Sequence, residues 1–251
     1  MPENIGRTLI AATANPLGLP PDAEALDASG VLALALERVG RDRLVLVSSF
    51  GVEDMVLLDL LTRLEPRPRV VTLDTGRLPE ETYAVMEAAR DRYGIELEVY
   101  APDATAVEEL VRRDGPNLMY RSLENRLSCC EIRKVLPLRR ALSTADGWIT
   151  GVRRDQTPSR KGVPKLGVDL EHGLIWKAAP LADWTSDAVW DYVRREEVPY
   201  NALHDAGYPS IGCAPCTRAV APDGDPRSGR WWWEQGGSRE CGLHVPRGGQ
   251  K

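Results

Sequence analysis

Two strand-turn-helix units place the strongest constraint on how this chain can fold. Residues 43–49 form a compact apolar run typical of a buried parallel strand, and residues 55–64 follow with the apolar periodicity of a helix. A second unit repeats this order, with a strand at 69–73, a turn at 74–76 and a helix at 79–93. Strands that alternate with helices predict an α/β fold with a doubly wound, mainly parallel sheet, whose ligands bind beyond the carboxyl ends of the strands.

The rest of the chain continues this pattern. Cys130 to Leu142 are predicted to form an amphipathic helix that opens at a pair of adjacent cysteines, and Pro137 should kink it or shorten its regular part. Residues 114–126 are expected to be irregular, and the chain after Pro199 should consist mainly of loops. The other predicted elements are helices at 31–39, 104–113 and 185–196, strands at 96–100 and 148–152, and a hairpin at 168–180.

Size and composition indicate one domain with flanking segments. We expect an extension at 1–30, the α/β domain at 31–220 and a loop-rich C-terminal tail at 221–251. No apolar run approaches the roughly 20 residues of a membrane helix. The N-terminus does not resemble a secretory signal, so a cytoplasmic location is expected. The net charge of -5 argues against binding of nucleic acid through bulk charge.

Four of the five cysteines form two pairs, Cys129 with Cys130 and Cys213 with Cys216. In a reducing compartment such groups are more often metal ligands than disulfides, and four thiolates suit either a zinc ion or an iron-sulfur cluster. Adjacent cysteines are awkward around one small ion, whereas a four-iron cluster presents separate irons to neighbouring thiolates. The pattern therefore favours one 4Fe-4S cluster per chain, with zinc, buried thiols or a strained vicinal disulfide as alternatives.

One lysine follows the adjacent cysteines closely. Lys134 lies four residues after Cys130, which is about one helical turn. Its ammonium group could therefore lie beside the cluster or beside a bound anion. A solvated lysine on a helix surface is the alternative.

The fifth cysteine, Cys241, stands apart from the two pairs and lies three residues before His244. The segment around it is cationic, with Arg227 and Arg230 upstream. Positive charge favours the thiolate form of cysteine, so Cys241 is a candidate nucleophile. An inert thiol in a tail is the alternative.

Three turns that follow predicted strands carry groups suited to a phosphate. Ser48-Ser49-Phe50-Gly51 supplies hydroxyls, backbone N–H groups and a helix N-terminus, although it is neither a Walker A loop nor a dinucleotide fingerprint. Leu73-Asp74-Thr75-Gly76 ends the neighbouring strand. The segment from Gly151 to Arg160 adds guanidinium groups, including that of Arg153, which suit phosphate or sulfate. Together the turns predict one anion-binding crevice, and solvated loops are the alternative for each.

These motifs resemble the assimilatory sulfonucleotide reductases and, within that family, the cluster-containing adenylyl-sulfate (APS) reductases. The resemblance spans residues 48–244, and its most specific part is the combination of the two cysteine pairs with Glu240-Cys241-Gly242-Leu243-His244. The other matching segments are Ser48-Ser49-Phe50-Gly51-Val52-Glu53-Asp54, Leu73-Asp74-Thr75-Gly76, Cys129-Cys130-Glu131-Ile132-Arg133-Lys134, Thr150-Gly151-Val152-Arg153-Arg154-Asp155-Gln156, Arg227, and Arg230-Trp231-Trp232-Trp233-Glu234.

The resemblance implies a fold similar to that of the adenine nucleotide alpha hydrolases, with the turn at 48–51 as a modified pyrophosphate-binding loop. It also implies that Cys241 attacks the sulfur of APS, forms a Cys S-sulfonate and releases AMP. Thioredoxin or a similar dithiol would then free sulfite. Such chemistry needs cations, because a thiolate must approach an anionic substrate.

The same resemblance implies roles for individual residues. The side chains expected to contact the phosphosulfate are Lys134, Arg160, Arg227 and His244, and Arg230 would support the tail. The cluster would position Lys134 and tune its electrostatics without passing electrons. The full set expected to bind the substrate is Ser48, Ser49, Phe50, Gly51, Leu73, Thr75, Lys134, Gly151, Arg153, Arg160, Arg227, Arg230 and His244. Assembly into a homo-oligomer is compatible with this description.

Three alternative functions stay open. A phosphoadenylyl-sulfate (PAPS) reductase, or an enzyme that uses both nucleotides, is the nearest, but most of that branch lacks the cluster cysteines. A thiolase-type tRNA-modifying enzyme of the same fold would carry a Ser-Gly-Gly-x-Asp-Ser loop, whereas this chain has Ser-Ser-Phe-Gly-Val-Glu-Asp at 48–54. A cluster-based redox sensor would call for a basic DNA-reading helix, which we do not find in the sequence.

Overall fold

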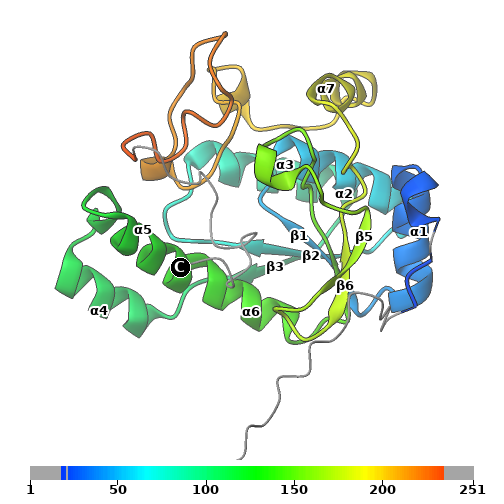
Figure 1. Ribbon diagram of the computed structural model, residues 1–251, viewed down its shortest axis with the longest axis horizontal. Helices are drawn as coiled ribbons and strands as arrows, with labels where there is room; N and C mark the ends of the chain where they lie inside the picture. The colour runs from blue at the N-terminus through cyan, green and yellow to red at the C-terminus, as the bar shows by residue number, and fades with distance from the viewer. Residues whose placement is uncertain (1–17, 21, 235–251) are drawn as a thin grey trace, which may run out of the picture.

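The computed structural model describes residues 18–20 and 22–234, which form a six-stranded sheet with helices on both faces (Figure 1). The strand order is β3-β2-β1-β4-β6-β5, and all neighbouring strands are parallel except β5 and β6. The doubly wound, mainly parallel α/β fold predicted from the sequence is confirmed. The strands are β1 (Leu44–Ser48), β2 (Arg69–Leu73), β3 (Leu97–Tyr100), β4 (Gly147–Ile149), β5 (Leu166–Asp169) and β6 (Ile175–Ala178).

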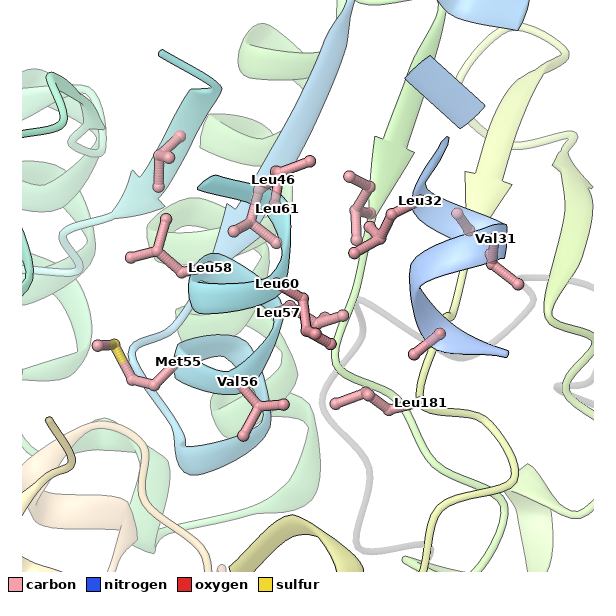
Figure 2. Packing of buried hydrophobic residues seen from close by; sticks show 14 of the residues in the cluster. Val31, Leu32, Leu46, Met55, Val56, Leu57, Leu58, Leu60, Leu61 and Leu181 are labelled. Carbon is pink, nitrogen blue, oxygen red and sulfur yellow. The ribbon is translucent and has the colours of Figure 1, made fainter. Parts of the chain in front are cut away.

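The helices cover opposite faces of this sheet because successive strand residues point to opposite sides. Leu46 of β1 belongs to the large core formed with α1, α2 and α3, and Figure 2 shows Leu61 of α2 beside it. Val45, the preceding residue, packs with Leu138 of α6 on the other face. The helices are α1 (Ala28–Val39), α2 (Val52–Leu64), α3 (Glu80–Tyr93), α4 (Ala104–Asp114), α5 (Leu123–Cys130), α6 (Leu136–Leu142) and α7 (Ser186–Arg195).

The strand order creates a crevice at the carboxyl end of β1. The chain passes from β1 to β2 and β3 on one side, and then returns to place β4 on the other side of β1. The helix after β1 packs on one face of the sheet and α6, which precedes β4, packs on the other, which is the arrangement that forms ligand crevices in doubly wound folds. Two of the three turns singled out in the sequence flank this point.

The adjacent cysteines end a helix, so the prediction that a helix opens there is wrong. Helix α5 begins three residues before Arg126, where the Ser122 hydroxyl accepts a hydrogen bond from the Asn125 N–H (3.1 Å), and it ends at Cys130. A π-helical turn, Glu131–Val135, then leads into α6. Pro137 has no N–H with which to continue the α-helical pattern, which fits the predicted shortening of the regular helix.

Other elements differ from their predicted bounds by a few residues. The irregular stretch expected at 114–126 is shorter, because it contains a 3-10 turn at Leu118–Tyr120 and the start of α5. The predicted strand at 148–152 is β4 and ends at Ile149. The expected hairpin is formed by β5 and β6. None of the described helices combines the length and the apolarity that a membrane-spanning segment requires.

Candidate active site

The loop between β1 and α2 is held in one conformation by its own side chains. The N–H and the hydroxyl of Ser49 both donate to Asp54 Oδ2 at 2.7 Å, and the N–H of Phe50 donates to the Ser48 hydroxyl at 3.1 Å. Phe50 has a φ of 56°, which is unusual for a residue with a side chain, and it is buried in the core. These hydrogen bonds hold the loop in a conformation that its sequence alone would not favour.

Asp54 also joins this loop to the loop after β4. Gly151 donates its backbone N–H to Asp54, and a Cβ atom at Gly151 would lie 2.4 Å from Asp54 Oδ1. Only glycine allows this approach, since real Cβ contacts below 3.0 Å essentially never occur. Burial raises the pKa of Asp54 to about 6, the hydrogen bonds from Ser49 oppose this rise, and the charge of Glu53 adds to it.

Glu53, the neighbouring carboxylate, organises the third turn. Its Oε1 atom accepts from Nε and Nη2 of Arg153, each at 3.0 Å, and from Gln156 Nε2 at 2.9 Å. Arg153 contacts Asp155 as well, and Arg154 contacts Glu24. Both guanidinium groups are thus engaged with carboxylates of the protein.

The turn after β2 connects the crevice to the cysteines. The Thr75 hydroxyl lies 3.2 Å from Cys213 Sγ, and Arg133 donates through Nη1 to the Thr75 carbonyl oxygen at 2.7 Å. In addition, the Ala214 N–H donates to the Arg77 carbonyl oxygen at 2.8 Å. Hydrogen bonds therefore hold the segment with the second cysteine pair against the turn that follows β2.

All four paired cysteines are buried thiols that line one small cavity. Cys129 and Cys130 come from the end of α5, and Cys213 and Cys216 flank a 3-10 turn, Ala214–Cys216. In the described part of the chain, no group of three or more His, Cys, Asp or Glu side chains is arranged to hold a metal ion. The cavity thus brings the four thiols together, and their role as metal ligands stays a prediction.

The surroundings of this cavity favour negative charge. Its cationic lining residues are Arg77, Arg126, Arg133, Lys134 and Arg230. Two buried N–H groups on its lining residues, Arg133 Nε and Trp231 Nε1, have no hydrogen-bond acceptor among residues 18–20 and 22–234. A group with negative charge and several acceptor atoms would fit both observations.

The surroundings shift the pKa of three of these thiols, Cys129, Cys213 and Cys216. Burial raises the pKa of Cys129, and burial together with the neighbouring Cys213 raises the pKa of Cys216 to about 12. Burial acts on Cys213 in the same direction, but Lys134 and the hydrogen bond with Thr75 outweigh it and lower its pKa. Of these three thiols, Cys213, which contacts Thr75, is the one whose charged form is favoured relative to an ordinary cysteine.

A cleft of about 1000 Å³ opens beyond the carboxyl ends of β1, β2 and β4. The cysteine cavity adjoins it, because Lys134, Arg230 and Trp231 line both spaces. The predicted substrate-binding residues that line the cleft are Ser48, Ser49, Gly51, Leu73, Thr75, Lys134, Gly151, Arg153, Arg160, Arg227 and Arg230. The structure therefore brings together residues from all three turns and from the loop-rich segment after Pro199.

The remaining predicted residues are placed differently. Phe50 packs in the main hydrophobic core and does not line the cleft. Cys241 and His244 lie outside the described residues. The roles of all these side chains in substrate binding stay predictions.

Sequence reasoning gave no role to Glu53, Asp54 or Arg126. Asp54 could have been found, because it lies three residues after the helix N-cap Gly51, where a side chain can turn back to the preceding loop. Glu53 and Arg126 make their contacts with residues more than 90 positions away, so no local signal marks them.

Comparison with known proteins identifies the family. Residues 43–219 match the model of the phosphoadenosine phosphosulfate reductase domain. The chain belongs to this family. It is 47% identical over 203 residues to a protein of Allochromatium vinosum named adenosine 5'-phosphosulfate reductase, with 81% of this chain and 79% of that protein covered. A protein of the same name from Sinorhizobium fredii is 47% identical over 222 residues, with 88% and 87% covered.

Solved structures agree with this family assignment. The phosphoadenylyl-sulfate reductase of Candida auris, in a phosphate complex, has a TM-score of 0.65 and 28% identity, with 78% of this chain and 91% of that chain covered. The FMN adenylyltransferase of Candida glabrata, in complex with FAD and inorganic pyrophosphate, has a TM-score of 0.53 and 14% identity, with 74% and 61% covered, and shows the fold alone. The expected similarity to the adenine nucleotide alpha hydrolase fold is confirmed.

The raised pKa of Asp54 predicts a pH-dependent stability. The folded protein binds this proton more tightly than an unfolded chain does, so the stabilisation is complete below about pH 4 and is lost as the pH rises through about 6. Asp54→Asn removes this loss. The free energy of unfolding of the variant should therefore rise relative to wild type by about 2 kcal/mol between pH 4 and pH 7.

Urea unfolding at a series of pH values measures this difference. Asp91→Asn, on the exposed surface of α3, is the control and should show a difference that does not vary with pH. A constant difference between wild type and Asp54→Asn would contradict the prediction.

Proposed function

We propose that this chain reduces adenosine 5'-phosphosulfate (APS) to sulfite and AMP in sulfate assimilation. The observation that carries the proposal is that Lys134 and Arg230 line two spaces at once. One space is the cleft, which is large enough for a nucleotide, and the other is the cavity of four thiols. Membership of the sulfonucleotide reductase family and the names of the relatives support the same substrate. The chain would act in the cytoplasm, where its thiols stay reduced.

Different residues of the cleft would bind different parts of the substrate. The β1–α2 loop, with its fixed Ser49 and the N-terminus of α2, suits the nucleotide phosphate. Lys134, Arg160 and Arg227 would neutralise the phosphosulfate. Because Arg153 is engaged with Glu53 and Asp155, we assign it to holding the third turn in place.

We further propose that Cys129, Cys130, Cys213 and Cys216 hold one 4Fe-4S cluster. Four thiols, a cationic lining and two buried N–H groups that lack acceptors suit a negatively charged group rich in sulfur. When bound, the cluster would supply a fixed charge that tunes the electrostatics around Lys134. The chain's own contribution is to hold Lys134 between this site and the cleft.

The nucleophile in this proposal is Cys241. Its thiolate attacks the sulfur of APS, the S–O bond to the phosphate breaks, and AMP leaves with the bonding electron pair. A thiolate of thioredoxin or a similar dithiol then attacks Cys241 Sγ, and sulfite leaves with the electrons of the S–S bond. The second thiol of the reductant resolves the mixed disulfide, which restores the Cys241 thiol and supplies the two electrons.

Reduction of the 3'-phosphorylated nucleotide (PAPS) is a second candidate function. The structural similarity to the Candida auris phosphoadenylyl-sulfate reductase supports it. The two cysteine pairs favour APS. We therefore expect sulfite release from APS to exceed that from PAPS when the two nucleotides compete, and a preference for PAPS would overturn the choice.

Replacement of the nucleophile should separate catalysis from cofactor binding. Cys241→Ser should abolish sulfite formation, because an alkoxide is not available at neutral pH, while iron, sulfide and the brown absorbance stay at wild-type levels. Ser238→Ala is the control in the same segment and should retain activity. Assays of full-length protein purified without oxygen measure both properties, and turnover by Cys241→Ser would refute the assignment.

Removal of the cation shared by the two spaces should slow the chemistry. Lys134→Ala should lower kcat/KM about 100-fold, because a positioned charge that stabilises the transition state is lost, with little change in iron content. Arg139→Ala, an exposed cation on α6, is the matched control and should leave the rate unchanged. Normal turnover by Lys134→Ala would contradict the proposed role.

A further inference from the structure

A short described segment, Arg230–Glu234, forms the root of the chain that continues to Cys241. Within it Trp231 is almost fully buried, and its φ of 44° places it in the left-handed region. The Arg126 guanidinium lies over the Trp231 ring at 4.5 Å from its centroid, and the Arg230 guanidinium lies over it at 4.8 Å. The Trp231 ring of this segment therefore contacts two guanidinium groups.

A buried ion pair fixes the last described residue of the root. Arg126 Nε donates to Glu234 Oε1 at 2.5 Å, and Arg126 Nη2 donates to Glu234 Oε2 at 3.2 Å. The Arg126 side chain is 2% exposed and that of Glu234 is 11% exposed. A bidentate pair of this kind defines orientation as well as distance.

The root is attached to both cysteine-bearing segments. Arg126 lies in α5, three residues before Cys129. On the other side, Arg230 Nε donates to the Cys216 carbonyl oxygen at 3.3 Å, and the Trp231 N–H donates to the same oxygen at 3.3 Å. The position of Glu234 is thus set by the two elements that gather the thiols.

We propose that the Arg126–Glu234 pair is a positioning device that fixes the residue from which the chain continues toward Cys241. The inference rests on the proposed function of Cys241. Six residues lie between Glu234 and Cys241, so the Cα atoms of these two residues can be at most about 25 Å apart. A fixed origin beside the cleft raises the effective concentration of the nucleophile at the substrate.

The energetics of the pair agree with a positioning role. Two buried charges lose their hydration, and this loss offsets much of their attraction, so a buried ion pair is a poor source of stability. Apolar side chains of similar size would stabilise the site equally well. What they would not supply is the two-point geometry that holds Glu234 in one orientation.

The test replaces both charges at once. Arg126→Met combined with Glu234→Met leaves no buried unpaired charge, and methionine retains a favourable contact with the Trp231 ring. The control removes the exposed pair Glu87 and Arg90 on α3 by Glu87→Met with Arg90→Met. Full-length protein purified without oxygen is compared for iron and sulfide content, AMP affinity and the single-turnover rate of sulfonate transfer at saturating APS.

Arg77, Arg133, Lys134 and Arg230 still line the thiol cavity in the first double variant, so we expect its iron content and AMP affinity to stay within about twofold of wild type. The single-turnover rate should fall about 100-fold. The control should match wild type in all three. A wild-type rate in the first double variant would overturn the inference, and so would a parallel fall in rate, iron content and AMP affinity, which would indicate a merely structural pair. A wild-type protein that never gains a sulfonate would overturn the proposed function, and the inference with it.

Discussion

The contact between Asp54 and Gly151 is the interaction on which the cleft depends. β1 and β4 are neighbours in the sheet, and the loops that follow them meet because Gly151 has no side chain to keep Asp54 away. The same carboxylate accepts two hydrogen bonds from Ser49, so one buried acceptor sets the shape of two loops. Its burial is unfavourable for the charged form, which indicates that the arrangement is retained for what it positions rather than for stability.

A second layer of organisation extends from these loops to the thiols. Thr75, which follows β2, contacts Cys213 through its hydroxyl and accepts a hydrogen bond from Arg133 at its carbonyl oxygen. The residue after Arg133 is Lys134, which lines both the cleft and the thiol cavity. The end of β2 is therefore connected to the cysteines through the side-chain contacts of a single residue, Thr75. A change in charge at the thiols would act on the cleft through side chains that are already in contact, with no need for a conformational change.

The sequence predicted the βα units well because each carries its own local signal. The apolar run at 43–49 and the periodicity that follows correspond to β1 and α2, and the two cysteine pairs meet at one cavity. Local patterns could not reveal the pairing of Arg126 with Glu234, 108 positions apart, or the absence of room for a Cβ atom at Gly151. They also misplaced the adjacent cysteines, because a π-helical turn has no distinctive periodicity over five residues.

That π-helical turn has a geometric consequence. A π turn contains one residue more than an α turn, and each residue of an α-helix rotates the chain by about 100°. The segment Glu131–Val135 therefore acts as a phase shift between α5, which orients Cys129 and Cys130, and α6, which packs on the sheet. Its consequence is that Cys129 and Cys130 point in directions that an unbroken α-helix continuing the register of α6 would not give them.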